Sequence, residues 1–304
     1  MSYKNDLVSV IIPTYKRADK LKRAIDSVCS QTYDYLEILV VNDNDNNDEY
    51  TKSLVDLIES IEDSRVRLVF QEKHINGAAA RNAGIKVAKG EYIAFLDDDD
   101  IWHPQKIEKQ IEVMKSLDES YGAVSTMFSS FLENKIISKS IPYKDGLIWE
   151  EILLRRCDVT TCSVLIRHKA LDETGYFDES LRRHQEIQIL AFLSKKYKIF
   201  LLQEYLLYVD AWGENNPKPE KILGIKKDFF ASIEPLLNDL PLKRQNDIKK
   251  MHYFEVAYIF FKHGRYINAI KYSLPLLTSI NCMKYAIERV RNRKISKDLA
   301  NNEK

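Results

Sequence analysis

Four consecutive aspartates at positions 97–100 follow directly on an apolar run at positions 92–96. The aromatic and branched side chains of that run are typical of a buried strand. Four carboxylates at one strand end repel one another, which raises their pKa values or requires a cation among them. Mg²⁺ or Mn²⁺ would meet this requirement, because hard divalent cations bind through oxygen ligands. A solvated acidic turn is the alternative, but open α/β sheets bind ligands at the carboxyl ends of their strands.

Two other predicted strand ends carry polar residues that are unlike ordinary connectors. The first loop contains Tyr15, whose ring could stack on a nucleobase or simply cover the edge of the sheet. This loop lacks glycine, so it is neither a P-loop nor a dinucleotide-binding turn. The second loop begins with Asn42 and Asp43, which could accept hydrogen bonds from a uracil or thymine N3–H or from ribose hydroxyls. The same residue types also form ordinary turns.

Arg81 lies within a run of small residues at positions 78–84. Small side chains let a ligand or a neighbouring backbone approach closely, and a single guanidinium among them suggests an anionic partner. The planar fork of arginine suits a diphosphate. An arginine paired with an acid of the core is the structural alternative.

Strands and helices alternate along the first hundred residues. The apolar patterns predict strands over 7–12, 36–41, 65–70 and 92–96, and helices over 19–30, 51–61 and 78–89. Pro13 should stop the first strand, and Asp19 should cap the first helix. Such alternation predicts a parallel sheet covered by helices on both faces. Further helices are expected over 105–117 and 183–196, with a strand over 199–209 between the second of these and the tail.

The chain changes character at residues 212–219, which contain two prolines, a glycine and two asparagines. We place a domain boundary near residue 215, with one domain at 1–215 and a helical extension at 216–304. The last predicted helix is rich in basic residues, which form either a solvated face or a docking face for an anionic membrane leaflet. These residues are Lys284, Arg289, Arg291, Arg293, Lys294 and Lys297.

The overall composition is that of an ordinary globular protein. The 304 residues are 45% hydrophobic and 30% charged with a net charge of +1, which argues against a nucleic-acid partner. The four cysteines form no C-x-x-C pair, which suits reduced thiols in the cytoplasm. The first residues run straight into a strand without a signal peptide, and no apolar stretch approaches the ~18 residues of a membrane span. We therefore expect a cytoplasmic protein, with peripheral contact with the inner face of the membrane left open.

An ordered set of motifs resembles the family 2 glycosyltransferases of GT-A fold. The motifs lie at residues 8–15, 30–33, 40–43, 76–84, 90–100, 102–104 and 175–179. The resemblance covers roughly residues 7–210 and leaves the helical tail uncovered. It implies an α/β protein with a Rossmann-like mixed sheet flanked by helices, followed here by a C-terminal helical extension.

The resemblance also implies roles for individual residues near the nucleotide. Residues matching Pro13, Tyr15 and Asp43 hold the nucleobase in that family, and Arg81 matches a basic position near the nucleotide. The activity implied is transfer of a sugar from a nucleotide-diphosphate donor, with a UDP-sugar favoured. The acceptor would be a hydroxyl of a glycan or lipid-linked glycan in surface polysaccharide synthesis.

The four acids are divided by the same resemblance. Asp97, Asp98 and Asp99 match the family's D-x-D motif. Asp99 corresponds to the ligand of Mn²⁺ or Mg²⁺, while Asp97 and Asp98 correspond to residues against the ribose and the sugar. Asp100 has no assigned role other than shaping the turn before Trp102.

The general base is the point at which the sequence departs from the family pattern. The family mostly works by inversion, with Glu-Asp or Gln-Asp at the start of a later helix. Here the chain has His184, Gln185 and Glu186, so the matching carboxylate is one methylene longer. Glu186 is the expected base, and a glutamate favoured only by the helix dipole is the alternative. A non-catalytic sugar-nucleotide-binding subunit and, less favoured, a nucleotidyltransferase are the competing functions.

Overall fold

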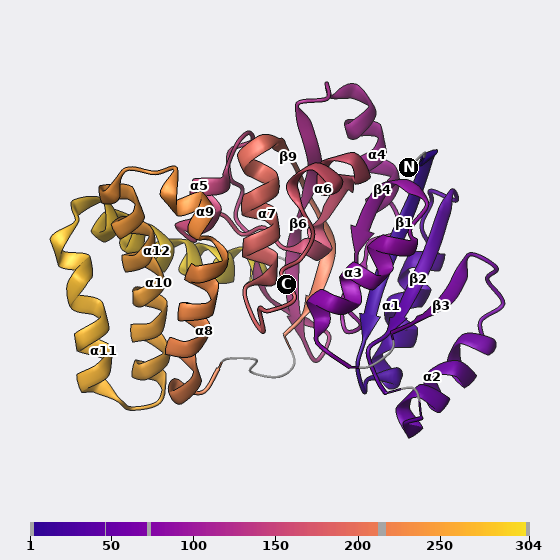
Figure 1. Cartoon of the computed structure of the whole chain (residues 1–304), viewed down its shortest axis with the longest axis horizontal. Helices are drawn as coiled ribbons and strands as arrows, with labels where there is room; N and C mark the ends of the chain where they lie inside the picture. Colours follow the sequence, from indigo (N-terminus) through magenta and orange to yellow (C-terminus); the bar gives the residue numbers. More distant parts are fainter. Residues whose placement is uncertain (1–2, 46, 72–73, 212–216, 302–304) are drawn as a thin grey trace.

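A computed structural model of the chain describes residues 3–45, 47–71, 74–211 and 217–301. The strands are β1 (Lys4–Thr14), β2 (Leu36–Asn42), β3 (Val66–Phe70), β4 (Gly90–Phe95), β5 (Ile101–Trp102), β6 (Tyr121–Leu132), β7 (Lys135–Lys139), β8 (Val164–Arg167) and β9 (Lys198–Asp210). Within these residues they form one nine-stranded sheet in the order β3-β2-β1-β4-β8-β6-β9-β5, and β7 pairs with β6. Figure 1 shows this sheet in the part of the molecule coloured indigo to salmon.

The first four strands of the sheet are parallel, as the sequence predicts. β1 pairs with β2 on one side and with β4 on the other, and β3 pairs with β2. The expectation that Pro13 ends the first strand is wrong, because Pro13 lies within β1 opposite Val41. β4 pairs with β1 only as far as Ile11. The missing N–H of Pro13 therefore falls beyond that ladder and costs no hydrogen bond.

The second half of the sheet makes it mixed. β8 pairs antiparallel with both β4 and β6, whereas β9 runs parallel to β6 and antiparallel to β5. β6 is twelve residues long, whereas β7 and β8 have five and four residues. The mixed sheet of the expected fold class is confirmed.

Helices cover both faces of the sheet. They are α1 (Ala18–Cys29), α2 (Glu49–Glu59), α3 (Gly77–Val87), α4 (Lys106–Ser116), α5 (Trp149–Leu153), α6 (His168–Thr174) and α7 (Gln185–Lys196), with a short 3-10 helix η1 (Thr161–Ser163). Side chains of α1, α2 and α4 share one apolar core with the sheet, and those of α3, α5, α6 and α7 share the other. Successive side chains of β1 point to opposite faces of the sheet, so Val10 belongs to the first core and Ile11 to the second.

Two local details correct or explain the sequence pattern. α1 begins at Ala18 with Arg17 at the N-cap position, so Asp19 is not its cap. The small residues of α3 let that helix lie close against the sheet. A Cβ atom at Gly84 would stand 2.5 Å from the side chain of Ile11, which leaves no room for any larger residue there.

The tail is helical, as predicted. It comprises α8 (Pro219–Ser232), α9 (Glu234–Asn238), α10 (Leu242–Lys262), α11 (Tyr266–Ser273), a 3-10 helix η2 (Leu274–Thr278) and α12 (Ile280–Asn301). Residues of α8, α9 and α10 belong to the same apolar core as α5 and α7, so the extension packs on the sheet domain. The predicted boundary at residue 215 lies outside the described residues.

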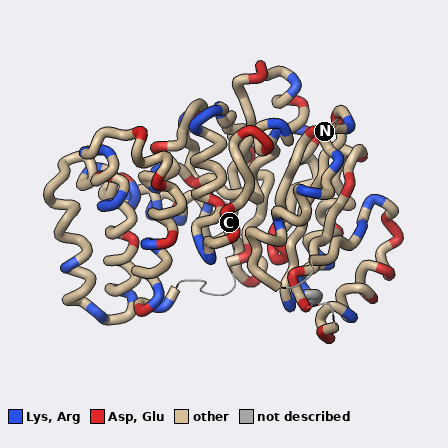
Figure 2. The backbone as a smooth tube through the Cα atoms, viewed as in Figure 1, with Lys and Arg blue, Asp and Glu red and all other residues tan. Residues whose placement is uncertain are grey.

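The last helix returns from the extension to the sheet. In Figure 1, α12 runs back toward the centre of the molecule, where the C-terminus is marked. Ser296 of α12 donates a hydrogen bond of 2.5 Å to the carbonyl oxygen of Lys139 and accepts one from its amide, which ties the helix to β7. Positive and negative residues are interspersed over both parts of the chain (Figure 2), in keeping with the net charge of +1.

Candidate active site

Seven of the eight predicted site residues line a single cavity of about 320 Å³. They are Pro13, Tyr15, Asp43, Arg81, Asp97, Asp98 and Asp99. The cavity lies where β1, β2 and β4 end, because the carboxyl ends of parallel strands meet at one edge of the sheet. Loops that are separated in sequence are thereby brought to one place.

Tyr15, Asp43 and His74 form one end of this cavity. The Tyr15 ring is 39% exposed and stacks on the His74 ring, with centroids 4.1 Å apart and planes 16° apart. The Asp43 carboxylate is buried, accepts a hydrogen bond of 3.0 Å from the side chain of Gln71 and lies 3.2 Å from His74 Nδ1. Burial raises the pKa of Asp43. A flat aromatic surface beside a fixed acceptor is suited to a nucleobase.

The acidic end of the cavity is crossed by an arginine that the sequence analysis assigned no role. Arg17 Nη1 lies 2.6 Å from Asp99 and 3.4 Å from Asp98. Thr14 donates a hydrogen bond of 2.9 Å to Asp98. Burial raises the pKa of Asp98 to about 6 in spite of these partners, and burial together with the Asp97 charge raises the pKa of Asp99. The carboxylates are therefore short of positive charge even with Arg17 in place.

The donor set of this cluster fits a hard divalent cation. Asp97, Asp98 and Asp99 all line the cavity, and carboxylate oxygens are the ligands that Mg²⁺ and Mn²⁺ prefer. A second group of possible ligands, which includes a thiol, suits a hard divalent cation less well. Ligand atoms of Asp97, Asp100 and Cys162 lie within 4.8 Å of one another, but burial raises the pKa of the Cys162 thiol well above its usual range. Asp100 instead accepts a hydrogen bond of 3.0 Å from the amide of Asp210, which fixes the turn against β9.

Arg81 lies at the border of the cavity and makes several contacts. It forms an ion pair with Asp97 and lies 3.4 Å from the side-chain oxygen of Gln185 on α7. Its Nε atom is buried and has no hydrogen-bond partner among the described residues. Arg81 therefore has features of both interpretations made from the sequence, because it is paired with an acid and also lines the cavity.

A second cavity of about 300 Å³ adjoins the first, because Arg81 and Asp97 line both. Glu186, the eighth predicted residue, lines this second cavity. Its side chain is 38% exposed in the first turn of α7. The carboxylate therefore stands across the Arg81–Asp97 pair from the cavity that contains Tyr15 and Asp43.

The C-terminal extension contacts the start of α7 through a buried lysine. Lys226 of α8 donates hydrogen bonds to His184 Nε2 at 2.9 Å, His252 Nδ1 at 3.0 Å and Glu255 at 3.1 Å. Because His184 accepts at Nε2, its proton is on Nδ1, which lies 4.0 Å from Glu186 Oε1. His184 adopts a left-handed backbone conformation with φ of 65° at the N-cap of α7. The lysine thus fixes the ring that faces the predicted base.

Sequence reasoning missed Arg17, His74 and Lys226. Arg17 and His74 lie in loops that follow predicted strands, and this position at the same edge of the sheet as Tyr15 and the acids could have suggested a role. Lys226 has no such signal, since it is one of many lysines in the helical tail and becomes special only by burial against α7.

Comparison with known proteins identifies the family. The family model described as "Glycosyl transferase family 2" matches residues 9–175, which is more than half of the chain. The chain belongs to glycosyl transferase family 2. The match includes every predicted site residue except Glu186, which lies beyond its end.

Several curated proteins are similar to this family 2 chain. An uncharacterized glycosyltransferase of Rickettsia felis is 34% identical over 60% of this chain and 30% of its own length. WfaP of Escherichia coli, named a UDP-Glc:alpha-D-GlcNAc-diphosphoundecaprenol beta-1,3-glucosyltransferase, is 34% identical over 56% of this chain and 62% of its own. TuaG of Bacillus subtilis, named for teichuronic acid biosynthesis, is 27% identical over 87% and 96%. The chain thus spans less than two thirds of the first two relatives.

Solved structures support the fold. TarS of S. aureus in complex with UDP-GlcNAc has a TM-score of 0.62 at 16% identity, over 98% of this chain and 92% of that one. The mannosyltransferase PcManGT of Pyrobaculum calidifontis, in complex with GDP-Man and Mn²⁺, has a TM-score of 0.59 at 13% identity, over 93% and 79%. The expected GT-A fold with a helical C-terminal region is therefore confirmed.

Proposed function

We propose that this protein is an inverting, metal-dependent glycosyltransferase. It would move a sugar from a nucleotide-diphosphate donor, a UDP-sugar being favoured, to a hydroxyl of a glycan or lipid-linked glycan in surface polysaccharide synthesis. The observation that carries the proposal is the pair of adjoining cavities. One contains the aromatic and acidic residues suited to a nucleotide, the other contains Glu186, and the Arg81–Asp97 pair lies between them.

The proposed reaction assigns a task to each cavity. Tyr15 and Asp43 hold the base of the nucleotide, and Arg81 stabilises the charge that develops on the leaving diphosphate. The acceptor hydroxyl enters the second cavity, where Glu186 accepts its proton. The acceptor oxygen bonds to the anomeric carbon as the bond from that carbon to the phosphate oxygen breaks. Attack occurs opposite the leaving group, so an α-linked donor gives a β-glycoside.

The proposed mechanism includes a divalent cation because the carboxylates of Asp97, Asp98 and Asp99 lie together at the donor cavity. Asp99 would hold Mn²⁺ or Mg²⁺, with Asp97 and Asp98 turned toward the ribose and sugar. Such a cation, when bound, neutralises charge on the leaving diphosphate. Arg17 would have to release Asp99 to make room, since its guanidinium now contacts that carboxylate.

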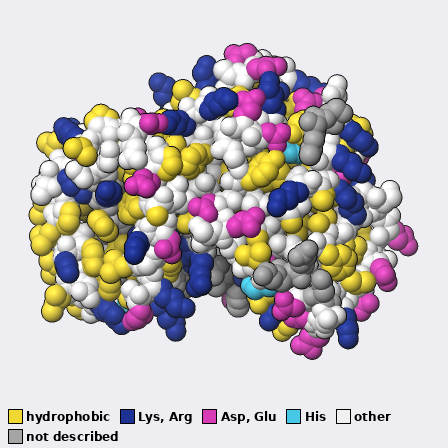
Figure 3. Space-filling view, viewed as in Figure 1, with side chains coloured by type: hydrophobic (Ala, Val, Ile, Leu, Met, Phe, Trp, Pro, Cys, Tyr) yellow, Lys and Arg dark blue, Asp and Glu magenta, His cyan; other side chains and the backbone are white. Residues whose placement is uncertain are grey.

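We also propose a cytoplasmic location with peripheral contact with the inner face of the membrane. Among the described helices, none is both long and apolar enough to cross a bilayer. Large apolar side chains are exposed on the C-terminal helices instead, including Ile267 at 85%, Ile270 at 59% and Leu277 at 65%. In Figure 3, hydrophobic side chains gather on the left, over these helices. Basic residues of α12 would complement an anionic leaflet.

The function is tested with the purified full chain and a panel of UDP-, dTDP- and GDP-sugars, each with Mn²⁺ or with EDTA. Thermal stabilisation by one donor, strongest with Mn²⁺, and transfer to an acceptor are expected. NMR of the product should show the anomeric configuration inverted, and retention would contradict the proposed mechanism. Donor binding with neither transfer nor hydrolysis would instead support a non-catalytic sugar-nucleotide-binding subunit.

A further inference from the structure

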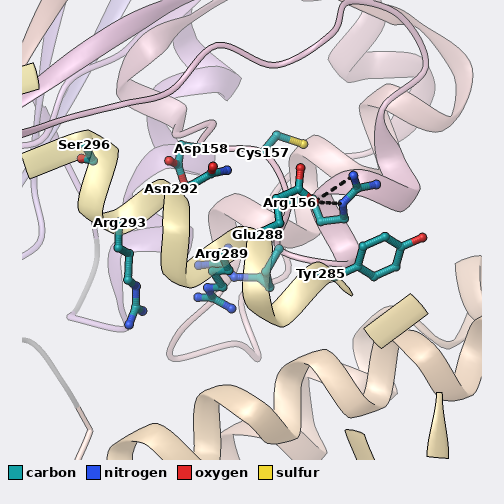
Figure 4. A pocket seen from close by; sticks show the side chains of 10 residues that line it. Arg156, Cys157, Asp158, Tyr285, Glu288, Arg289, Asn292, Arg293 and Ser296 are labelled. Carbon is teal, nitrogen blue, oxygen red and sulfur yellow. Dashed lines mark hydrogen bonds and ion pairs between the residues drawn. The ribbon is translucent and has the colours of Figure 1, made fainter. Parts of the chain in front are cut away.

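A third cavity, of about 170 Å³, lies between α12 and the segment at residues 155–158. Arg155, Arg156, Arg289 and Arg293 line it together with the acids Asp158 and Glu288. With four arginines and two acids, the lining carries a net charge of +2. Figure 4 shows Arg289 and Arg293 extending from α12, with Arg156 bonded to Glu288. The basic residues of α12 are therefore not all a solvated face, since two of them line this cavity.

Three of the four arginines already have partners: Arg155 and Arg156 lie near acids, and the Arg293 guanidinium lies over the Tyr258 ring, 4.7 Å from its centroid. Arg156 is hydrogen-bonded to Glu288 at 3.1 Å and to Glu151 at 2.5 Å, and its guanidinium lies over the Tyr285 ring. Arg155 lies 3.9 Å from Glu255, but its buried Nε has no hydrogen-bond partner among the described residues. Arg155 also has a left-handed backbone conformation with φ of 58°, which is strained for a non-glycine residue.

Arg289 is the arginine whose buried charge is least offset by hydrogen bonds or ion pairs. Its Nη1 atom is buried and lacks a hydrogen-bond partner in the described part of the chain. Burial and the nearby charge of Arg155 lower the pKa of Arg289 to about 10, so it remains a cation at neutral pH. A buried guanidinium with an unmet donor costs free energy unless an anion binds to it.

The basic cavity adjoins the proposed acceptor cavity. Arg155, Cys157 and Asp158 line both. An acceptor whose hydroxyl lies near Glu186 could thus extend past residues 155–158 and place a second part of itself against α12. Beside Arg289 on that helix, Ile287 and Val290 are 69% and 59% exposed.

The size and charge of the cavity select the kind of anion. Its volume is several times the ~30 Å³ that one water molecule occupies in the liquid, so it can hold a group larger than a single carboxylate. Arginine forks bind phosphate oxygens in pairs. A diphosphate that is esterified at both ends carries two negative charges, which match the net charge of the lining.

We propose that this cavity binds a phosphate or diphosphate group of the acceptor substrate. Arg289 and Arg293 provide its main contacts, and Arg155 links it to the acceptor cavity. The inference rests on the proposed function, because it defines the substrate class of the same site as a phosphate-linked glycan. The residues involved are outside the donor cavity, so the two claims can fail separately.

The test uses the full chain with UDP and Mn²⁺ at saturating concentration, so that the donor cavity is occupied. Calorimetric titration with decyl diphosphate is compared with titrations with decyl phosphate, decanoate and decyl glucoside. We expect decyl diphosphate to bind most tightly and inorganic pyrophosphate to displace it. Arg289→Gln should weaken its binding about tenfold or more, since a buried charged hydrogen bond is lost. Arg293→Gln should weaken it as well.

The control is Arg291→Gln, which removes the same charge from an exposed position of the same helix that does not line the cavity. This variant should bind decyl diphosphate within about twofold of the wild type. If Arg289→Gln folds poorly, Arg293→Gln at its exposed position still decides the question. Equal binding of decyl diphosphate and decyl glucoside, or unchanged binding in both cavity variants, would overturn the proposal.

Two further measurements distinguish a phosphate of the acceptor from a phosphate of bilayer lipid. Vesicles of phosphatidylglycerol report on bilayer headgroups, and their binding should be unaffected by Arg289→Gln. If that variant loses vesicle binding and decyl diphosphate does not compete with vesicles, the cavity recognises bilayer lipid and the proposal is wrong. UDP affinity, measured in each variant, should stay unchanged. Failure of UDP to bind even to the wild type would refute the proposed function instead.

Discussion

At the scale of single residues, the site is a cluster of acids that one arginine partly neutralises. Asp98 and Asp99 are raised in pKa by burial, yet Arg17 contacts both. A divalent cation and Arg17 would therefore compete for Asp99. Metal binding at the proposed site should therefore depend on where the Arg17 side chain lies, because its guanidinium contacts both Asp98 and Asp99 in this structure.

Replacement of Arg17 tests this competition. Arg17→Gln is expected to tighten Mn²⁺ binding to the donor-free protein several-fold, because a positive charge that repels the ion is removed. Asp99→Asn should weaken binding, and Lys22→Gln, at an exposed residue of α1 paired with Asp26, should leave it unchanged. Competition with a Mn²⁺ indicator gives the affinities. Weaker binding in Arg17→Gln would show that the arginine supports the site rather than competes for it.

Replacement of Glu186 tests the base. Glu186→Gln should lower kcat by about 10²- to 10⁴-fold, the usual contribution of general base catalysis, while the Kd for UDP-sugar stays the same. Glu186→Asp should retain part of the activity, since aspartate is the residue at this position in the motif that the sequence resembles. Steady-state transfer assays and calorimetry measure the two quantities. A normal kcat in Glu186→Gln would remove this residue from the mechanism.

At the scale of elements, the C-terminal extension reaches the candidate active site through the start of α7. Lys226 of α8 bonds to His184, and His184 precedes Glu186 by two residues. Among the described residues, Lys226 contacts none of those that line the donor cavity. We propose that Lys226 positions Glu186, so its effect should be confined to the acceptor half of the reaction.

The positioning role of Lys226 predicts a specific kinetic pattern. Lys226→Met should lower kcat by about tenfold or more, since the ring that faces Glu186 loses its fixed tautomer, while UDP-sugar binding is unchanged. The matched control is Lys227→Met, at the neighbouring exposed position. A merely structural role would lower thermal stability without this split between kcat and donor affinity. Transfer kinetics, calorimetry and thermal unfolding of both variants distinguish the two cases.

The exposed apolar residues of α11 give a second prediction at this scale. Ile267→Glu is expected to reduce co-sedimentation with phosphatidylglycerol vesicles several-fold, because a charge replaces an inserted side chain. Leu147→Glu makes the same kind of change at a residue that is 54% exposed outside these helices, and it should have no effect. Equal vesicle binding by the two variants would argue against a membrane contact through α11.

At the scale of the whole molecule, a buried charged network joins the extension to the sheet domain. His184, His252 and Glu255 surround Lys226, and Arg155 and Arg289 lie near them. Burial, followed by the charge of Lys226, lowers the pKa of both imidazoles, to about 2 for His184. Both rings are therefore neutral in the folded protein at pH values where they are protonated in the unfolded chain.

This network predicts a loss of stability on acidification. Between the folded pKa values and the unfolded value of about 6.5, the unfolded chain binds more protons, so stability falls as the pH falls. From pH 7 to pH 5 each imidazole should cost up to about 2 kcal/mol, at about 1.36 kcal/mol per unit of pKa. The lowered pKa of Glu255 acts in the same direction below pH ~4.5. The pKa of Lys226, lowered to about 8, acts only above that pH, where stability should rise.

Urea unfolding of the wild type and of His252→Gln at several pH values checks the prediction. Glutamine can still accept from Lys226 and donate to the carbonyl of Leu153, as His252 does at 3.0 Å, but it does not titrate. The variant should therefore lose less stability than the wild type between pH 7 and pH 5. Parallel curves for the two proteins would show that this imidazole is not the source.

The order of the elements and the composition of the donor cavity could be predicted from sequence, for a physical reason. Apolar runs mark buried strands, and parallel strands bring their following loops to one edge of the sheet. Tyr15, Asp43 and Asp97 therefore had to lie close together once the strands were recognised. The fate of Pro13 could not be predicted, because it depends on how far β4 extends beside β1.

Contacts between distant segments were decided only by the tertiary structure. The loop position of Arg17 places it at the same edge of the sheet as the acids but does not indicate that it would pair with Asp99, and Lys226 and Arg289 resemble the other basic residues of the tail. Their roles follow from burial against groups far along the chain, which raises or lowers pKa values and leaves donors unmet. Sequence alone thus determined the strands and the chemistry at their ends. Packing of the helical extension decided what lies behind Glu186 and which arginines line the third cavity.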